Sequence, residues 1–308
     1  MTLNNGNVDS KKTFTGKKVA GHAFGLKWKL GSFLQSFIFW MSSGRVMFVG
    51  LPRILVSRST RPSRFIVNRI GNTLTFTYEG RQVSFFASGP GNLLSQLREV
   101  FESQIYHQLD VKNRIVVDVG ANIGDTAIYF CLRGAQKVIA LEPYPSNFKA
   151  AKANIEANGV QDKVILVNAA VAGERGVTHV DERLAENSAD LRTFNAGTGI
   201  PLVPIDDLVE EYSIHEGILK IDCEGSEYEI LRNSSLLGRF SQIMVEYHYG
   251  AQDIPQLLKM KGFAVKKLYP SLPYRYNRHA TEPKTLIGLI GATRVDRKER
   301  RPSAGTFP

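Results

Sequence analysis

The stretch Ile115–Phe130, IVVDVGANIGDTAIYF, decides the fold of this chain. Its first three residues are apolar and β-branched, which predicts a buried parallel strand. The glycines Gly120 and Gly124 follow, and a helical pattern begins near Thr126. A strand, a glycine turn and a helix N-terminus together bring unpaired backbone N–H groups to a crevice at the carboxyl end of the strand. Glycine suits such a turn because a Cβ would keep the backbone from approaching a ligand.

The spacing of acids and glycines argues against a dinucleotide site, whose G-x-G-x-x-G turn packs a pyrophosphate against the helix. Here Asp118 stands at the strand tip, and three residues separate Gly120 from Gly124. A carboxylate at this tip would repel a pyrophosphate but suits a ligand with a cationic amino-acid end, such as S-adenosylmethionine. Glu142 ends the next apolar strand, VIALEP, where a carboxylate can accept both ribose hydroxyls.

Composition and charge are those of a soluble globular protein with one basic end. The chain has 308 residues, 43% of them hydrophobic, and a formal net charge of +10. Residues 1–64 carry +10 and residues 294–308 carry +3, which leaves −3 for the part between them. The two cysteines, Cys131 and Cys223, form no disulfide framework or metal-ligand pattern, so we expect a reducing, cytoplasmic location.

The basic N-terminal region holds an apolar segment from Leu30 to Val56, with side chains such as Phe33 and Phe37 at helical spacing. Its uncharged run is too short to span a bilayer. Two interpretations stay open. The segment is an amphipathic helix that covers the domain edge or a dimer partner, or residues 27–64 lie on an anionic membrane surface, here the inner one. We see no secretory signal peptide.

The rest of the chain alternates predicted strands and helices. Residues 73–87 form a β-hairpin around Glu79-Gly80, and a helix follows from about Asn92 to Leu109. Residues 172–201 are expected to be irregular, with a hairpin and a loop over the site. The alternation predicts an α/β fold, a Rossmann-like, doubly wound and mostly parallel seven-stranded sheet. We expect its strands at 114–119, 137–141, 164–171, 217–222, 241–248, 263–269 and 285–293.

Four regions follow from this pattern. Residues 1–64 are a basic, partly disordered region with the amphipathic helix, and residues 65–113 hold the hairpin and helix before the core. Residues 114–293 form the α/β domain with the predicted ligand crevice. Residues 294–308 are a disordered tail.

Polar side chains follow five successive predicted strands, where ligands of open α/β sheets bind. Their positions are Asp118, Glu142, Asn168, Asp222 with Glu224, and Glu246 with His248. A random distribution of polar residues would not place them all at strand tips, so we interpret them as one site.

The chain resembles the FkbM-type family of S-adenosylmethionine-dependent methyltransferases, within the class I Rossmann-like group. The stretches that carry the resemblance are VVDVGANIGDTAIYF, VIALEPYPSNFKAAKANIEANG, VPIDDL, LKIDCEGSEYEIL and IMVEYH. They occur in the expected order over roughly residues 114–249, about half of the chain. The basic N-terminus and the tail lie outside the match.

The resemblance implies S-adenosylmethionine as the cofactor and assigns residues to it. Asp118 and the Gly120–Gly124 loop, which includes Ala121 and Asn122, would hold the methionine end, and Glu142 would accept the ribose hydroxyls. Asn168 lies where such enzymes contact the adenine, although a satisfied loop amide explains this residue equally well.

The resemblance also places the acceptor chemistry at the fourth and fifth strands. A hydroxyl acceptor needs a base, and His248, next to Glu246, is the first candidate because its pKa would lie near working pH. Asp222 is the second. For Glu227 we favour helix N-terminal capping.

The segment after the fourth strand reads D-C-E-G, not N-P-P-Y or D-P-P-Y, which argues against methylation of a nucleobase amine. We therefore expect an oxygen acceptor such as a hydroxyl on a sugar, a lipid-linked glycan or another small molecule. Asp222, Glu246 and His248 carry donors that suit a divalent ion, but nothing in their spacing demands one, and we assign no metal.

Three other functions agree less well with the sequence. A nicotinamide-dependent oxidoreductase would also use Glu142, but the glycine spacing and Asp118 are wrong for it. A non-catalytic scaffold or membrane-associated binding protein with the cofactor fold should have lost some of the polar strand tips. Nucleic-acid binding through the basic N-terminus is disfavoured because the aromatic residues there fall at helical core spacing.

Overall fold

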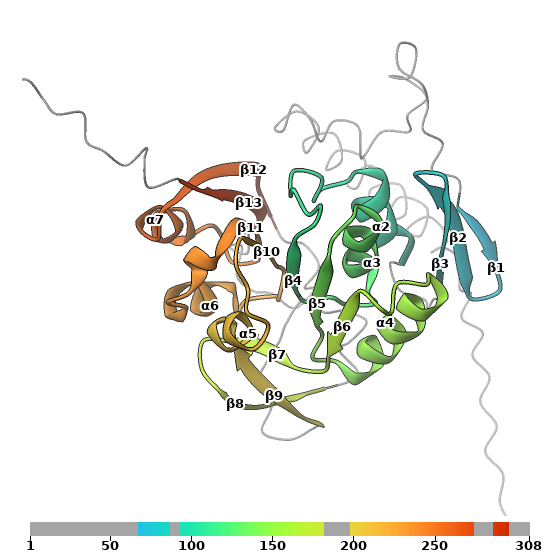
Figure 1. The fold of residues 1–308 in the computed structure, drawn as a ribbon, viewed down its shortest axis with the longest axis horizontal. Coiled ribbons are helices and arrows are strands. Elements are labelled where there is room, and N and C mark those ends of the chain that lie inside the picture. Colours follow the sequence, from blue (N-terminus) through green and yellow to red (C-terminus); the bar gives the residue numbers. More distant parts are fainter. Residues whose placement is uncertain (1–66, 87–92, 182–197, 274–285, 296–308) are drawn as a thin grey trace, which may run out of the picture. The chain divides into compact units, whose positions relative to one another are not determined.

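A seven-stranded sheet forms the centre of the fold in the computed structural model, which describes residues 67–86, 93–181, 198–273 and 286–295 (Figure 1). All of them belong to one compact unit within residues 60–308. The strand order is β12-β13-β11-β10-β4-β5-β6. The strands are β4 (Ile115–Val119), β5 (Lys137–Leu141), β6 (Val164–Val167), β10 (Gly217–Ile221), β11 (Phe240–Tyr247), β12 (Phe263–Pro273) and β13 (Leu286–Arg294).

The strand directions confirm the predicted Rossmann-like, mostly parallel architecture. The strands β6, β5, β4, β10 and β11 pair in parallel, and only β13 runs antiparallel to its neighbours β11 and β12. The chain order reverses on either side of β4, whose neighbours are β5 and β10. Such a switch point leaves a crevice at the carboxyl ends of the strands.

Helices cover both faces of the sheet, as the doubly wound fold requires (Figure 1). Adjacent residues of β4 point to opposite faces, so Val116 and Val117 belong to two different apolar clusters. The first cluster includes side chains of α3 (Asp125–Leu132) and α4 (Pro145–Ala157). The second includes side chains of α5 (Ile205–Glu211), α6 (Glu227–Asn233) and α7 (Ile254–Met260).

The predicted hairpin is confirmed as β2 (Thr73–Tyr78) and β3 (Arg81–Phe86), and a short strand that was not predicted, β1 (Asn68–Ile70), extends it. Glu79 and Gly80 have φ values of 47° and 79°, and a two-residue type I′ turn requires positive φ at both positions. The ring of Phe85 packs on Phe101, with 5.8 Å between ring centroids.

The predicted helix over residues 92–109 is wrong beyond Glu102. The helix α2 (Leu93–Leu97) continues only as a π-helical turn, Arg98–Glu102, which ends when the Ser103 N–H donates to the Arg98 carbonyl at 2.7 Å. Gln104 then adopts a left-handed φ of 51°, which a helix interior does not tolerate. Buried apolar residues continue past this point in turns, which explains the misleading periodicity.

The predicted strand over residues 164–171 is two strands. β6 ends at Val167, and β7 (Ala170–Ala172) joins a separate three-stranded sheet with β8 (Gly176–Val180) and β9 (Thr198–Pro204). The hairpin expected within residues 172–201 corresponds to the antiparallel pair β8 and β9, although residues 182–197 between them lie outside the described residues. The sequence does not show the break because the segment VILVNAAV is almost continuously apolar.

The predicted amphipathic helix and the tail beyond Val295 lie outside the described residues, as does all of the basic region 1–64. No helix within the described residues has the length and apolar character needed to cross a membrane.

We expect Asn154→Ala to lower the free energy of unfolding by about 1–3 kcal/mol, because it leaves the buried Ile123 carbonyl without its hydrogen-bond donor. Asn154 is fully buried in α4, donates to the Ile123 carbonyl at 3.0 Å and accepts from the Phe86 N–H at 2.8 Å. Urea denaturation measures the effect. The matched control is Asn158→Ala, because Asn158 bonds the partly exposed Ser84 and water can replace these bonds. Equal losses in the two variants would contradict the argument.

Candidate active site

A cavity of about 200 Å³ lies at the carboxyl ends of β4, β5, β10 and β11. It brings together residues predicted to bind the cofactor and residues predicted to be catalytic. The predicted site residues that line it are Gly120, Asn122, Glu142, Asp222 and Glu246. The other five lie behind this lining and are Asp118, Ala121, Gly124, Asn168 and His248.

The turn after β4 packs directly on the turn after β10. Gly120 has a φ of 76°, and a Cβ on it would lie 1.8 Å from the backbone oxygen of Asp222. The N–H groups of Gly120 and Ala121 both donate to the Leu141 carbonyl, at 3.0 and 2.9 Å. Only glycine fits at this position, since any side chain would push the two turns apart.

Glu142 is a buried carboxylate whose position is fixed by the backbone. Its Oε2 accepts the Asn122 N–H at 2.8 Å and its Oε1 accepts the Tyr144 N–H at 3.0 Å. Burial raises the pKa of Glu142 to about 7, although these hydrogen bonds act in the opposite direction. A carboxylate has about four lone-pair sites, so it can accept a ligand hydroxyl besides these bonds.

Asp118 does not line the cavity but lies below it, fully buried. Its Oδ2 accepts the Thr126 hydroxyl at 2.6 Å, and its Oδ1 lies 3.2 Å from the Lys220 ammonium. Direct contact of Asp118 with the cofactor therefore stays a prediction, whereas its pairing with Lys220 is a feature of the structure.

Lys220 is a buried residue of the cavity lining that the sequence analysis did not identify. It is directly opposite Asp118 in the β4–β10 pairing, and its side chain is 1% exposed. Its ammonium donates to the carbonyls of Val119 and Gly120 at 3.2 and 2.8 Å and lies 3.7 Å from an oxygen of Asp222. Burial alone would lower the pKa of Lys220, but Asp118 and Asp222 raise it. The available signal was a lysine inside the apolar strand GILKI, where a charge needs a buried partner.

Asn168 lies at the break between β6 and β7. Its amide nitrogen donates to the carbonyls of Glu142 and Pro143, at 2.8 and 3.1 Å. This supports the loop-amide interpretation, and a contact with adenine stays a prediction.

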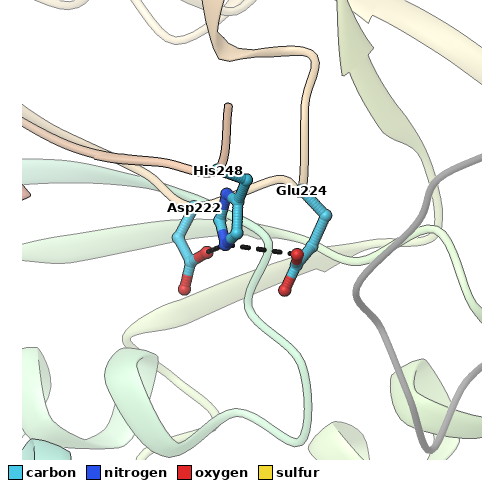
Figure 2. Close-up of side chains that lie close together, drawn as sticks. All are labelled: Asp222, Glu224 and His248. Atoms are coloured by element: carbon cyan, nitrogen blue, oxygen red, sulfur yellow. Dashed lines mark ion pairs between the residues drawn. The ribbon is translucent and has the colours of Figure 1, made fainter. Parts of the chain in front are cut away.

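On the acceptor side, Asp222 and Glu224 flank the ring of His248 (Figure 2). The Nε2 of His248 lies 3.2 Å from Glu224 Oε2 and 3.8 Å from Asp222 Oδ1. Burial lowers the pKa of His248, but Glu227, Glu224 and Asp222 raise it, and the result is about 10. His248 does not line the cavity, whereas Asp222 and Glu246 do, so a role of His248 as the base stays a prediction.

Glu227 does more than occupy the start of α6, where we expected a capping role. It is fully buried; its Oε2 accepts the Gly225 N–H at 2.7 Å and its Oε1 accepts the His248 N–H at 2.9 Å. One carboxylate thus joins the turn after β10 to the end of β11.

The cavity is strongly acidic. Its lining includes six carboxyl groups and, among the described residues, one basic side chain, Lys220; the acids are Glu99, Asp125, Glu142, Asp222, Glu224 and Glu246. Burial raises the pKa of Asp125 to about 6, and burial and Asp222 raise that of Glu246 well above its usual range. Such a cavity favours a cationic ligand and disfavours phosphate.

A doubly wound sheet with one antiparallel strand, a glycine turn after its first strand and a carboxylate after its second is the arrangement that the resemblance to class I S-adenosylmethionine-dependent methyltransferases predicts. Residues 118–265, just under half of the chain, match the model of the methyltransferase FkbM domain. Its cofactor is S-adenosylmethionine.

Short stretches of the chain are similar to curated methyltransferases. A segment of 55 residues is 44% identical to the ribosomal protein L11 methyltransferase of Acinetobacter baumannii (strain SDF), and 54 residues are 41% identical to that of Carboxydothermus hydrogenoformans. The match spans 18% of this chain and 18% of each relative, so it covers less than a fifth of the length of these proteins.

Solved structures are similar to the chain at lower identity. A putative transferase, PH0793 from Pyrococcus horikoshii, is 15% identical, with 73% of each chain covered and a TM-score of 0.41. M. capricolum TrmK in complex with S-adenosyl-homocysteine is 12% identical, with 66% of this chain and 67% of that chain covered and a TM-score of 0.40.

Removing the Lys220 charge should destabilise the fold and disorder the glycine turn. In Lys220→Met, Asp118 is left as a buried charge without its counterion, so we expect unfolding free energy to fall by about 3–5 kcal/mol. S-adenosylhomocysteine affinity, measured by calorimetry, should fall with it. Lys137→Met is the control, because that ammonium bonds a carbonyl at the surface. Wild-type stability in Lys220→Met would refute the pairing argument.

Glu142 should make stability depend on pH. Its folded pKa of about 7 lies above the value of about 4.3 in an unfolded chain, so the folded state binds more protons between these values. The stability it contributes is complete below the unfolded pKa and is lost as pH rises through the folded one. We expect Glu142→Gln to flatten this fall, measured by denaturation at a series of pH values, and the exposed Glu156→Gln to leave it unchanged. An unchanged pH dependence of the free energy of unfolding in Glu142→Gln would contradict the raised pKa of Glu142.

Proposed function

We propose that the protein transfers the methyl group of S-adenosylmethionine to a hydroxyl oxygen of a sugar, a glycan or another small-molecule or lipid-linked acceptor. The observation that carries the proposal is that Glu142 and the glycine turn line the same acidic cavity as Asp222 and Glu246.

The residues of the β4 and β5 tips suit the cofactor. Glu142 offers lone pairs for the ribose hydroxyls, and the turn around Gly120 and Asn122 lines the same cavity. Asp118 and Lys220 hold that turn from below. When bound, S-adenosylmethionine supplies a methyl group already activated on a sulfonium, so the protein mainly aligns the acceptor and accepts its proton.

We assign proton removal to Glu246, not to His248. Glu246 lines the cavity, and burial and Asp222 raise its pKa, which makes its carboxylate more basic than an exposed one. His248 lies outside the lining, and its Nε2 lies 3.2 Å from Glu224 and 3.8 Å from Asp222, so we assign it the positioning of these two carboxylates. Asp222 is the alternative base, since it also lines the cavity.

The acidic lining also supports a neutral acceptor. A hydroxyl compound brings no charge into the cavity, whereas the phosphates of a nucleic acid would meet repulsion there. The residues after β10, Asp222-Cys223-Glu224-Gly225, lack the prolines of amine-methylating motifs. Contact of residues 27–64 with a membrane surface and a cytoplasmic location stay predictions, and both are compatible with a lipid-linked acceptor.

Two measurements test the proposal. Calorimetry with S-adenosylhomocysteine should show binding to the wild type and much weaker binding to Glu142→Ala. A panel of saccharides, glycolipids, amines and RNA is then incubated with ¹³C-methyl-labelled cofactor, and NMR identifies the atom that carries the label. We expect labelled methyl ethers of hydroxyl acceptors. Label on nitrogen or carbon, or no binding of S-adenosylhomocysteine by the folded protein, would overturn the proposal.

A further inference from the structure

We propose that Asp222, Glu224 and His248 bind a divalent metal ion at the acceptor end of the cavity. One donor atom from each of these side chains lies within 4.8 Å of the others, so a single ion can contact all three (Figure 2). The spacing of residues in the sequence does not identify this set. The donors considered from the sequence were Asp222, Glu246 and His248, whereas in the structure Glu224 takes the place of Glu246.

His248 distinguishes this arrangement from an ordinary cluster of acids. Its side chain is 7% exposed, and its Nε2 points between the two carboxylates (Figure 2). Within the described residues its buried Nδ1 has no hydrogen-bond partner, and the nearest carboxylate oxygen, Glu227 Oε1, is 3.5 Å away. The Nε2 of this buried imidazole lies 3.2 Å from Glu224 and 3.8 Å from Asp222, where it can share an ion with both carboxylates.

The surroundings of the cluster resemble the outer shell of a metal centre. In such centres a carboxylate lies behind a metal-ligating histidine and fixes the orientation of its ring. Glu227 occupies that position and binds the backbone of both ligand segments, through the N–H groups of Gly225 and His248. Glu224 itself has a left-handed φ of 57°, an unfavourable conformation for a side chain of this kind.

Charge and access also favour a cation. Asp222 and Glu224 have side chains 28% and 22% exposed, and both line the cavity, so an ion can reach them from solvent. Lys220 lies 3.7 Å from Asp222 but is already paired with Asp118 at 3.2 Å, and so it offsets the local negative charge only in part. Two carboxylates and one imidazole suit a metal such as Mn²⁺ and leave coordination positions open.

The role of the ion rests on the proposed function, whereas its binding does not. A hydroxyl oxygen that ligates the ion becomes more acidic and loses its proton to Glu246. That oxygen then forms the bond to the methyl carbon while the sulfonium–methyl bond breaks, and the electron pair of the broken bond stays on the neutral thioether. The ion would be a Lewis acid and would not change its oxidation state.

Mn²⁺ binding to the full chain tests the site. Protein treated with EDTA and dialysed is titrated with MnCl₂, and EPR measures free Mn²⁺. We expect one ion per chain and, in the bound state, pulsed EPR modulation from the nitrogen of His248. Asp222→Asn and Glu224→Gln should each abolish tight binding, and Glu227→Gln should weaken it by about 10- to 100-fold. Glu99→Gln is the matched control, since it removes a cavity carboxylate outside the cluster and should leave affinity close to wild type.

Three results would overturn the site. They are the absence of Mn²⁺ binding, the absence of nitrogen modulation in the wild type, and binding that Glu246→Gln abolishes but Glu224→Gln preserves. The nitrogen modulation in the wild-type EPR spectrum tests whether His248 is a ligand even where a variant fails to fold. S-adenosylhomocysteine binding is measured on the same samples, so loss of the metal site is distinguished from failure of the proposed function. Methyl transfer that survives EDTA would refute the catalytic role of the ion.

Discussion

The buried ammonium of Lys220 is the constraint on which the site depends. A charge in this position is tolerated only with partners, and it has two carboxylates, Asp118 and Asp222, and the carbonyls of Val119 and Gly120. These groups belong to the ends of β4 and β10, the two central strands of the sheet. One side chain thus fixes both the turn that carries the predicted cofactor residues and the acid that begins the acceptor side.

A second buried side chain, Glu227, also joins two segments of the site. Glu227 holds the turn after β10 to the end of β11, as Lys220 holds it to the turn after β4. The lining carboxylates therefore stand on a rigid base of paired charges and backbone hydrogen bonds. Such preorganisation is what a methyl transfer needs, because the reaction depends more on alignment than on activation.

Much of this arrangement is readable from the sequence. The apolar runs and glycine turns predict the mostly parallel sheet and the places of its strands, and the acids at the strand tips predict several of the residues that meet in the cavity. The sequence hides interactions between distant segments. Lys220 pairs with Asp118, about a hundred residues earlier, and its local pattern is that of an apolar strand. The break at Asn168 and the left-handed Gln104 likewise depend on hydrogen bonds and backbone angles that apolar periodicity does not show.

The close packing of Gly120 on the Asp222 backbone has a consequence for ligand binding. With no room for even one methyl group between them, the two turns move as one body. A ligand that orders either turn has then met part of the entropic cost of ordering the other. Donor and acceptor should consequently bind with positive cooperativity, each raising the affinity for the other by the same factor. In an enzyme built this way, the ligand-free protein would bind either ligand alone with lower affinity than it binds the two together.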